Sequence, residues 1–325
     1  MAFTDARVEV LSEEKMVNSK RDKRKKFYKK LAQQKELVFI VLPFLVLLII
    51  FSYVPLWGWI IAFKNFNPAF GINKSPWVGL ENFKMLFEDP TFYQSIRNTL
   101  GISILKYFLG FFSSITLAVL INEVRNVKFK RTVQTISYLP HFVSWVVAAS
   151  IVLDVLSPNG VVNQLFLKLH IIKQSINFIG VPHLFWPLMA LSDMWKEVGW
   201  NSIIYLAAMT AIDSELYEAA SIDGAGRIRR IFSITLPSIV PTIKILLILN
   251  AGWILNAGFE QVFLLSNPMV IDYSQTLELY VYNYGIPMGR FSFATAAGIF
   301  NSVVSLAMVT LANRISKTLS GESAF

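Results

Sequence analysis

Six long apolar stretches dominate this chain and limit the folds that it can adopt. A helix needs about 20 residues to cross the hydrocarbon core of a bilayer, and the six stretches cover residues 37–62, 99–121, 133–153, 184–211, 242–264 and 291–312. In lipid, backbone polar groups must be bonded within the chain, as they are in helices. Only 16% of the residues are charged, whereas a soluble domain carries about a quarter. The sequence therefore predicts an all-α polytopic membrane protein, a bundle of six transmembrane helices.

The basic residues predict how this bundle is oriented. Cytoplasmic segments of membrane proteins are enriched in Lys and Arg. Here the basic residues gather in the tail 1–36, in the segments 125–131 and 227–230, and at Arg314 and Lys317. We therefore expect both termini to lie in the cytoplasm, with the tail on anionic lipid. The net charge of +9 follows from this distribution and does not indicate nucleic-acid binding.

A water-compatible helix-turn-helix at residues 213–241 interrupts the apolar pattern between the fourth and fifth stretches. Asp213 or the serine after it can cap the first helix by accepting free backbone N–H groups. Gly224 permits a sharp reversal, because glycine can adopt positive φ. The arginine-rich segment 227–230 opens a second amphipathic stretch, which Pro237 is expected to close. This pattern predicts a docking element.

The docking element has a characteristic spacing of residues. Glu218-Ala219-Ala220 is followed after three residues by Gly224, and then by Phe and Pro. This pattern resembles the cytoplasmic EAA loop of permease subunits of binding-protein-dependent ABC importers, which seats in a cleft of the ATPase subunit. Family members often have Pro where Asp213 stands, but Asp caps the same helix start. The resemblance implies that the ATPase-coupling residues are Glu218, Ala219, Ala220, Asp223, Gly224, Ala225, Arg227, Arg230, Phe232 and Pro237.

Other segments are similar to carbohydrate-uptake permeases. The first expected external segment carries Gly79-Leu80-Glu81-Asn82-Phe83 and, further on, Asp89-Pro90 and Asn98-Thr99. We expect this segment to form a short amphipathic helix that ends at Asp89-Pro90 and covers the helix bundle. The stretches 138–145 and 195–199 resemble the oligosaccharide and polysaccharide-fragment branch of these permeases.

The resemblance implies that this chain is one subunit of a transporter with several subunits. It implies a basic cytoplasmic tail (1–36), an ABC permease transmembrane domain (37–313) and a cytoplasmic C-terminal tail (314–325) in a bacterial-type inner membrane. The implied partners are a second homologous permease, two ATPase subunits or domains, an extracytoplasmic solute-binding protein, membrane lipid and a carbohydrate substrate, in particular an oligosaccharide. ATP and Mg would be bound by the ATPase subunits, so no cofactor is expected in this chain. Transport would proceed by alternating access.

Signatures of an enzyme are missing from the sequence. There is no cysteine and no Gly-x-x-x-x-Gly-Lys-Ser/Thr stretch, which excludes thiolate chemistry and a phosphate-binding loop of that type. His141, His170 and His183 lie far apart without metal-ligand spacing. We therefore expect no catalytic residues and no metal site, and we interpret the histidines as packing or interfacial residues.

Charged residues inside the fourth stretch are a first candidate for the solute path. Lys196 and Glu197 lie three and four residues after Asp193. On a helix, the three side chains can therefore share one face and partly neutralise each other's charge. Charge within a transmembrane helix usually faces protein or water and is functional. An internal salt bridge that fastens helices is the competing interpretation.

A polar stripe in the fifth stretch is a second candidate. On one helix, Asn250, Trp253, Asn256 and Glu260 project within about one third of the circumference. Amides and an indole suit sugars, whose hydroxyls form hydrogen bonds and whose C–H faces stack on aromatic rings. Polar contacts between helices would explain the same residues.

Two other classes of protein remain open at this point. An ion- or proton-coupled secondary transporter would use Asp193, Lys196 and Glu260 as coupling groups and would need no ATPase. A membrane scaffold without transport would leave the polar residues inside the spans unexplained.

Overall fold

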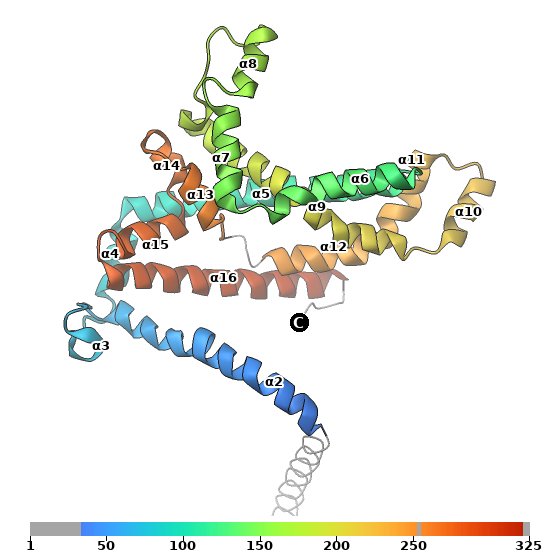
Figure 1. The fold of residues 1–325 in the computed structure, drawn as a ribbon. Helices are drawn as coiled ribbons and strands as arrows, with labels where there is room; N and C mark the ends of the chain where they lie inside the picture. The colour runs from blue at the N-terminus through green and yellow to red at the C-terminus, as the bar shows by residue number, and fades with distance from the viewer. Residues whose placement is uncertain (1–33, 252–254, 321–325) are drawn as a thin grey trace, which may run out of the picture. The chain divides into compact units, whose positions relative to one another are not determined.

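The computed structural model describes residues 34–251 and 255–320, and this part of the chain is almost entirely helical (Figure 1). Its only bridge between extended segments is an isolated one from Lys64 to Trp77. Most of the predicted basic tail lies outside the described residues, as does Trp253. The chain divides into two compact units, Met1–Ile60 and Ile61–Phe325. The all-α prediction is confirmed.

The first unit is the start of an apolar helical run. It is built from α2 (Lys35–Leu48), the π-helical segment η1 (Ile49–Tyr53) and most of the 3-10 segment η2 (Val54–Phe63). Within residues 35–60 nearly every side chain is exposed, although most are apolar. A helix that is apolar on all sides suits lipid, so this run fits the first predicted span.

The second unit holds all the other described helices. In chain order they are α3 (Gly71–Lys74), α4 (Glu81–Glu88), α5 (Pro90–Glu123), α6 (Val127–Tyr138), η3 (Leu139–Phe142), α7 (Trp145–Leu156), α8 (Val161–Lys168), η4 (Phe178–Gly180), η5 (Pro182–Leu184), α9 (Phe185–Thr210), α10 (Ser214–Ile222), α11 (Arg227–Arg230), η6 (Ile231–Thr235), α12 (Leu236–Ala251), α13 (Phe259–Leu265), η7 (Pro268–Val270), α14 (Ile271–Ser274), α15 (Leu277–Gly285) and α16 (Phe291–Ser320).

Several of these helices can cross a membrane. By length and composition, five helical segments of the described chain qualify: Lys35–Phe63, Pro90–Glu123, Trp145–Lys168, Arg227–Leu247 and Phe291–Leu311. At 26 residues α9 is also long enough to cross a bilayer, but it carries three charged side chains, Asp193, Lys196 and Glu197.

Two predicted spans differ from the observed helices. The stretch 133–153 is broken into α6, η3 and α7, because Pro140 cannot donate the next helical hydrogen bond and Ser144 caps a new helix at Val147 N. The stretch 242–264 is not one helix either. Its apolar helix starts upstream at residue 227, and a turn with Gly258 at φ +86° separates α12 from α13.

One end of the second unit is fastened by a cluster around Asp89. Its side chain caps α5 at Thr91 N (2.8 Å) and accepts hydrogen bonds from Tyr280 Oη (2.6 Å) and Tyr284 Oη (3.1 Å). Burial alone would raise the pKa of the Asp89 carboxyl, but these hydrogen bonds outweigh it and the pKa lies below its usual value. The predicted helix boundary at Asp89-Pro90 is confirmed, and α4 packs on α16 as a cover.

The core of the second unit lies along the contact of α5 and α9. Ile102 of α5 and Phe185 and Met189 of α9 form one buried cluster with Ala257 and Val262. Further along the same pair of helices, a second cluster joins α5 and α9 to α12: Ala118, Ile121, Tyr205, Leu206, Met209 and Ile239. This contact aligns the polar side chains described below.

Gly199 allows α9 to touch the backbone of α6, and a larger residue there is expected to lower the yield of folded protein. A Cβ on Gly199 would overlap the carbonyl group of Ser137, and a backbone neighbour cannot rotate away. We expect Gly199→Ala to destabilise the chain by about 1–3 kcal/mol, visible as a lower melting temperature in detergent. Gly298→Ala is the matched control, since nothing lies within 4 Å of its added Cβ. Equal melting temperatures of the two variants would contradict the close approach.

Candidate translocation cleft and coupling loop

The predicted docking element folds as a capped helix and a sharp turn. The side chain of Asp213 accepts a hydrogen bond from Glu215 N at 2.9 Å and so caps α10, as predicted. Gly224 has φ +75°, and Ala225 N bonds back to Ala220 O at 2.8 Å. The reversal therefore uses the positive φ that the sequence pattern called for.

Side-chain bonds hold the two arms of this loop together. Arg230 Nη1 donates to Ser221 Oγ at 2.9 Å, and Tyr217 Oη lies 2.9 Å from Thr235 Oγ1. The loop lies at the opposite end of the second unit from α4 and α15 (Figure 1). Its most exposed large apolar residues are Ile222, Ile228 and Phe232. An ordered loop with an apolar tip suits docking into a cleft of a partner protein.

Pro237 does not close the second arm, contrary to expectation. The chain passes from α11 through the π-helical segment η6 directly into α12, with Pro237 in the first turn of α12. Proline removes a hydrogen bond to the preceding turn, and local π-helical adjustments in transmembrane helices can re-satisfy the backbone groups that proline frees. The predicted docking element is thus joined to the membrane-spanning segment by one continuous helical run.

A cleft of about 340 Å³ opens between α5, α9, α12 and the turn before α13. It is lined by polar and aromatic side chains in spans that are otherwise apolar: Ser103, Lys106, Tyr107, Phe111, Ser114, Asp193, Asn201, Tyr205, Asn250 and Asn256. Of the predicted path residues, the cleft brings together Asp193, Asn250 and Asn256. Lys196, Glu197 and Glu260 do not line it.

The predicted stripe on a single helix is therefore corrected. Asn250 lies at the end of α12, where its Nδ2 donates to Leu246 O at 2.9 Å. Asn256 lies in the turn, and its Oδ1 accepts from Gly258 N at 3.0 Å, which stabilises the turn. Glu260 belongs to the next helix, α13. The turn, and not helical periodicity, places the two asparagines at one cleft.

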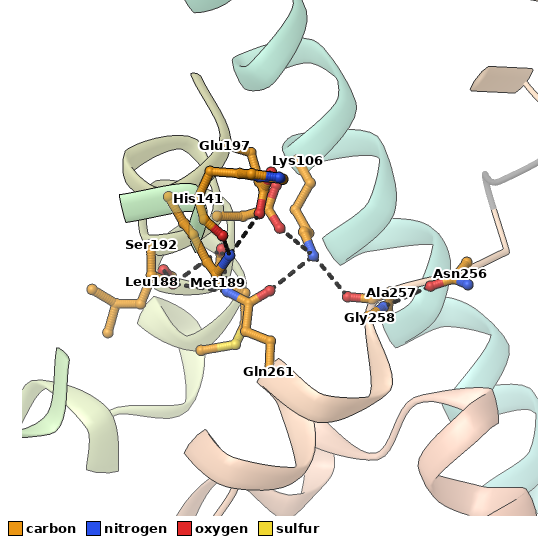
Figure 2. A network of polar contacts seen from close by, with 12 residues as sticks. Lys106, His141, Leu188, Met189, Ser192, Glu197, Asn256, Ala257, Gly258 and Gln261 are labelled. Atoms are coloured by element: carbon orange, nitrogen blue, oxygen red, sulfur yellow. Dashed lines mark hydrogen bonds and ion pairs between the residues drawn. The ribbon is translucent and has the colours of Figure 1, made fainter. Parts of the chain in front are cut away.

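Lys106 is the centre of a polar network that sequence reasoning missed (Figure 2). Its Nζ contacts Asp193 Oδ1 (2.8 Å), Gln261 Oε1 (2.8 Å) and Ala257 O (3.0 Å). Gln261 Nε2 in turn donates to Met189 O and Ser192 Oγ, both at 2.8 Å. The network ties α5, α9 and α13 together. The sequence feature that could have indicated this network is Lys106 itself, the only charged residue in the apolar stretch 99–121.

The acidic residues of α9 have other partners than expected. Asp193 is neutralised by Lys106 and not by Lys196. Lys196 Nζ donates to His141 O (2.8 Å) and pairs with the adjacent Glu197 (3.0 Å). His141, interpreted from sequence as a packing or interfacial residue, lies with Nδ1 2.6 Å from Glu197 Oε2 and stacks on Trp200. These charges fasten α9 to η3, as the salt-bridge interpretation anticipated.

Two serines in the cleft wall have unused hydrogen-bonding capacity. Ser103 and Ser114 of α5 are buried, and neither Oγ has a partner among the described residues. By contrast Thr99 and Thr116 of the same helix bond to the carbonyl four residues earlier. Hydroxyls, amides and the rings of Tyr107 and Phe111 in one cleft are suited to a polyhydroxylated solute. Among the described residues no group of acidic or histidine side chains could hold a metal ion.

Removing the cation of the network is expected to harm folding more than removing the whole ion pair. Lys106→Met leaves the carboxylate of Asp193, which is 21% exposed, without its cation, at a cost of up to about 3 kcal/mol. The double variant Lys106→Met, Asp193→Asn should recover part of the loss. Yields of monodisperse protein from size-exclusion chromatography measure both. If the double variant is worse than Lys106→Met alone, the two side chains do not act as a pair.

Comparison with known proteins decides the family. Residues 106–320 match the family of binding-protein-dependent transport system inner membrane components. The chain belongs to this family. The predicted membership in the permease subunits of binding-protein-dependent ABC importers is thereby confirmed, as is the prediction of a membrane component that is not an enzyme. The ion-coupled alternative is set aside, whereas the sidedness of the termini stays a prediction.

Individual relatives agree with this assignment. The chain is 44% identical to the polygalacturonan/rhamnogalacturonan transport system permease protein YteP of Bacillus subtilis (strain 168), over 94% of this chain and 95% of that protein. It is 42% identical to protein LplB of the same organism, over 91% and 92%. A crystal structure of a bacterial ABC transporter involved in the import of the acidic polysaccharide alginate contains a similar chain, with a TM-score of 0.82, 40% identity, and coverage of 91% and 99%.

Proposed function

We propose that this chain forms one part of the path by which an ABC importer carries fragments of an acidic polysaccharide across the inner membrane. The observation that carries the proposal is the polar cleft between α5, α9 and α12. Exposing the polar groups of this wall, its hydroxyls and amides, to lipid would cost free energy. In a path for sugars, the same groups can replace the hydrogen bonds that water makes to the sugar, and the aromatic rings can stack on it. Polygalacturonan and alginate, named for the relative and for the structural neighbour, supply the substrate class.

The partners follow from the family and from the loop. A second permease would complete the path, and two ATPase subunits or domains would bind ATP and Mg, since this chain holds no phosphate-binding loop. The related alginate transporter was crystallised in complex with its pentasaccharide-bound periplasmic protein, which supports an extracytoplasmic donor of substrate here. The loop from Glu218 to Pro237, including Ala219, Asp223 and Arg227, would contact the ATPase.

The continuous helical run from the loop into α12 gives this coupling a mechanical route. Residues 227–251 are helical without a break, and α12 supplies Leu246, Leu247 and Asn250 to the cleft. A displacement of the loop by closure of the ATPases would therefore be transmitted as movement of one cleft wall. Alternating access would result when the second permease moves in the same way.

Uptake by the reconstituted complex tests the proposal. Proteoliposomes containing this chain, its second permease and the ATPases, with binding protein outside and ATP inside, should accumulate oligogalacturonides or alginate oligosaccharides. Maltopentaose of similar length is the neutral control and should be taken up far less. Uptake of maltopentaose alone would contradict the acidic substrate class, and uptake driven by an ion gradient without ATP would contradict the importer mechanism.

A further inference from the structure

A positively charged side chain without an acidic partner lies near the start of α5. Arg97 donates to Asn98 Oδ1 (3.1 Å) and to the backbone oxygen of Asp272 (2.8 Å). Its guanidinium also lies over the rings of Tyr273 (5.4 Å) and Trp186 (5.9 Å). It forms no ion pair with any acidic residue in the described chain. Arg97 is thus ordered while its charge remains available.

The surroundings of Arg97 form an open hollow of about 630 Å³. Tyr93 and Gln94 of α5 and Asp272 and Tyr273 of α14 complete its lining. The carboxylate of Asp272 accepts a hydrogen bond from Gln94 Nε2 at 3.2 Å. Arg97 lies two residues before the apolar stretch that begins at Thr99. Arginine and aromatic residues are typical of the boundary between the hydrocarbon core and water.

An entirely apolar groove lies further along α5, between this helix and α9. It has a volume of about 400 Å³ and is lined by Leu105, Phe108, Leu109 and Phe112 of α5 with Pro187 and Leu191 of α9. We call it the lateral groove. The rings of Phe108 and Phe112 are 55% and 61% exposed, so no other described helix of the second unit covers them.

The hollow and the lateral groove face the same way. At 100° per residue, Phe108 and Phe112 lie within about 60° of Arg97 around α5, whereas Lys106 of the cleft lies about 180° away. Trp186 links the two sites, since it lies under Arg97 and directly precedes Pro187. The groove begins about 12 Å below Arg97 and extends to about 22 Å. One leaflet including its headgroup region is about 20–22 Å thick, so the acyl chain of a lipid whose headgroup lies at Arg97 can reach this depth.

We propose that Arg97 and the lateral groove together bind one membrane phospholipid, with its phosphate on the Arg97 guanidinium and an acyl chain along Phe108 and Phe112. A guanidinium matches a phosphate in geometry and charge, and the groove has no polar group that an acyl chain would leave unpaired. The lipid would support the α5–α9 pair from the side opposite the cleft.

Native mass spectrometry of the purified complex, with its second permease and ATPases, tests this site. Dioleoyl phosphatidylglycerol is titrated into delipidated complex, and dioleoylglycerol and inorganic phosphate serve as separate probes. One phospholipid should bind per copy of this chain. Arg97→Gln should weaken its binding by about tenfold or more, as expected for a lost charge-assisted hydrogen bond. Arg97→Lys should keep part of the affinity, and Phe108→Ala should weaken binding from the acyl end.

Lys84→Gln is the matched control for loss of one positive charge, because Lys84 lies on the neighbouring helix α4 and is well exposed. It should leave lipid binding unchanged, excess phosphate should not displace the lipid, and dioleoylglycerol should bind poorly. The proposal is overturned if Arg97→Gln binds as many lipids as the wild type, or if phosphate alone competes. It is also overturned if Phe112→Cys crosslinks in high yield to a cysteine on the second permease, because the groove would then be a protein interface.

Discussion

Gly224→Val will abolish most of the solute-stimulated ATP hydrolysis of the assembled importer while leaving membrane insertion intact. Gly224 has φ +75° with nothing within 4 Å of its missing Cβ. A β-branched residue is therefore excluded by backbone strain and not by crowding, at a cost of at least 1–2 kcal/mol. The turn must rearrange, and the exposed tip of the loop would then leave the position from which we propose that it contacts the ATPase. We expect stimulated hydrolysis to fall by about tenfold or more.

Gly226→Val is the matched control for this prediction. Gly226 lies two residues further on, and an added Cβ there also meets nothing within 4 Å, but its φ of −67° is open to any residue. Its variant should keep most of the stimulated hydrolysis. Co-purification of the ATPase with each variant separates detachment from uncoupling. If Gly224→Val hydrolyses ATP at the rate of Gly226→Val, the turn geometry has no part in coupling.

Filling the cleft from Gly110 is expected to block transport without preventing assembly. Gly110 lines the cleft, and nothing lies within 4 Å of a Cβ placed on it. An indole at this position would take up much of the available 340 Å³. We expect Gly110→Trp to reduce uptake by more than about tenfold. A tenfold weaker binding of the solute corresponds to a loss of about 1.4 kcal/mol of binding free energy. Gly110→Ala should transport nearly as well as the wild type.

Gly298→Trp provides the control for a large ring added to a transmembrane helix. Gly298 lies on α16, has open space at its Cβ and does not line the cleft. Uptake and complex yield are measured side by side for all three variants. If the uptake of Gly110→Trp falls only as far as its complex yield, the loss is one of folding and the cleft is not the path.

Local signals in the sequence predicted the parts of the structure that depend on neighbouring residues. Asp89 before Pro90 starts a helix because its carboxylate caps the free N–H of Thr91. Asp213 and Gly224 define the cap and the turn of the predicted docking element for equally local reasons. The long apolar stretches predicted the helical class, because lipid leaves the backbone few alternatives.

The contents of the cleft could not be predicted in the same way, because they depend on contacts between distant segments. The pairing of Lys106 with Asp193 requires α5 and α9 to lie side by side. The break between α12 and α13 depends on Asn256 and Gly258, and a Cβ on Gly258 would lie 3.0 Å from Lys106 Nζ. Helical periodicity, applied across this turn, placed Asn250, Asn256 and Glu260 on one face. The turn instead brings the two asparagines to the cleft and leaves Glu260 outside it.

Thiol labelling at position 201 tests most directly whether the cleft carries substrate and responds to ATP. The chain has no cysteine, and Asn201 is exposed on α9 where it lines the cleft. In the assembled complex, Asn201→Cys should react more slowly with a small maleimide when substrate-loaded binding protein is present. Its rate should change again when ATP and vanadate are added and ADP and vanadate become trapped in the ATPases. A labelling rate that neither substrate nor nucleotide alters would contradict a substrate path through this cleft.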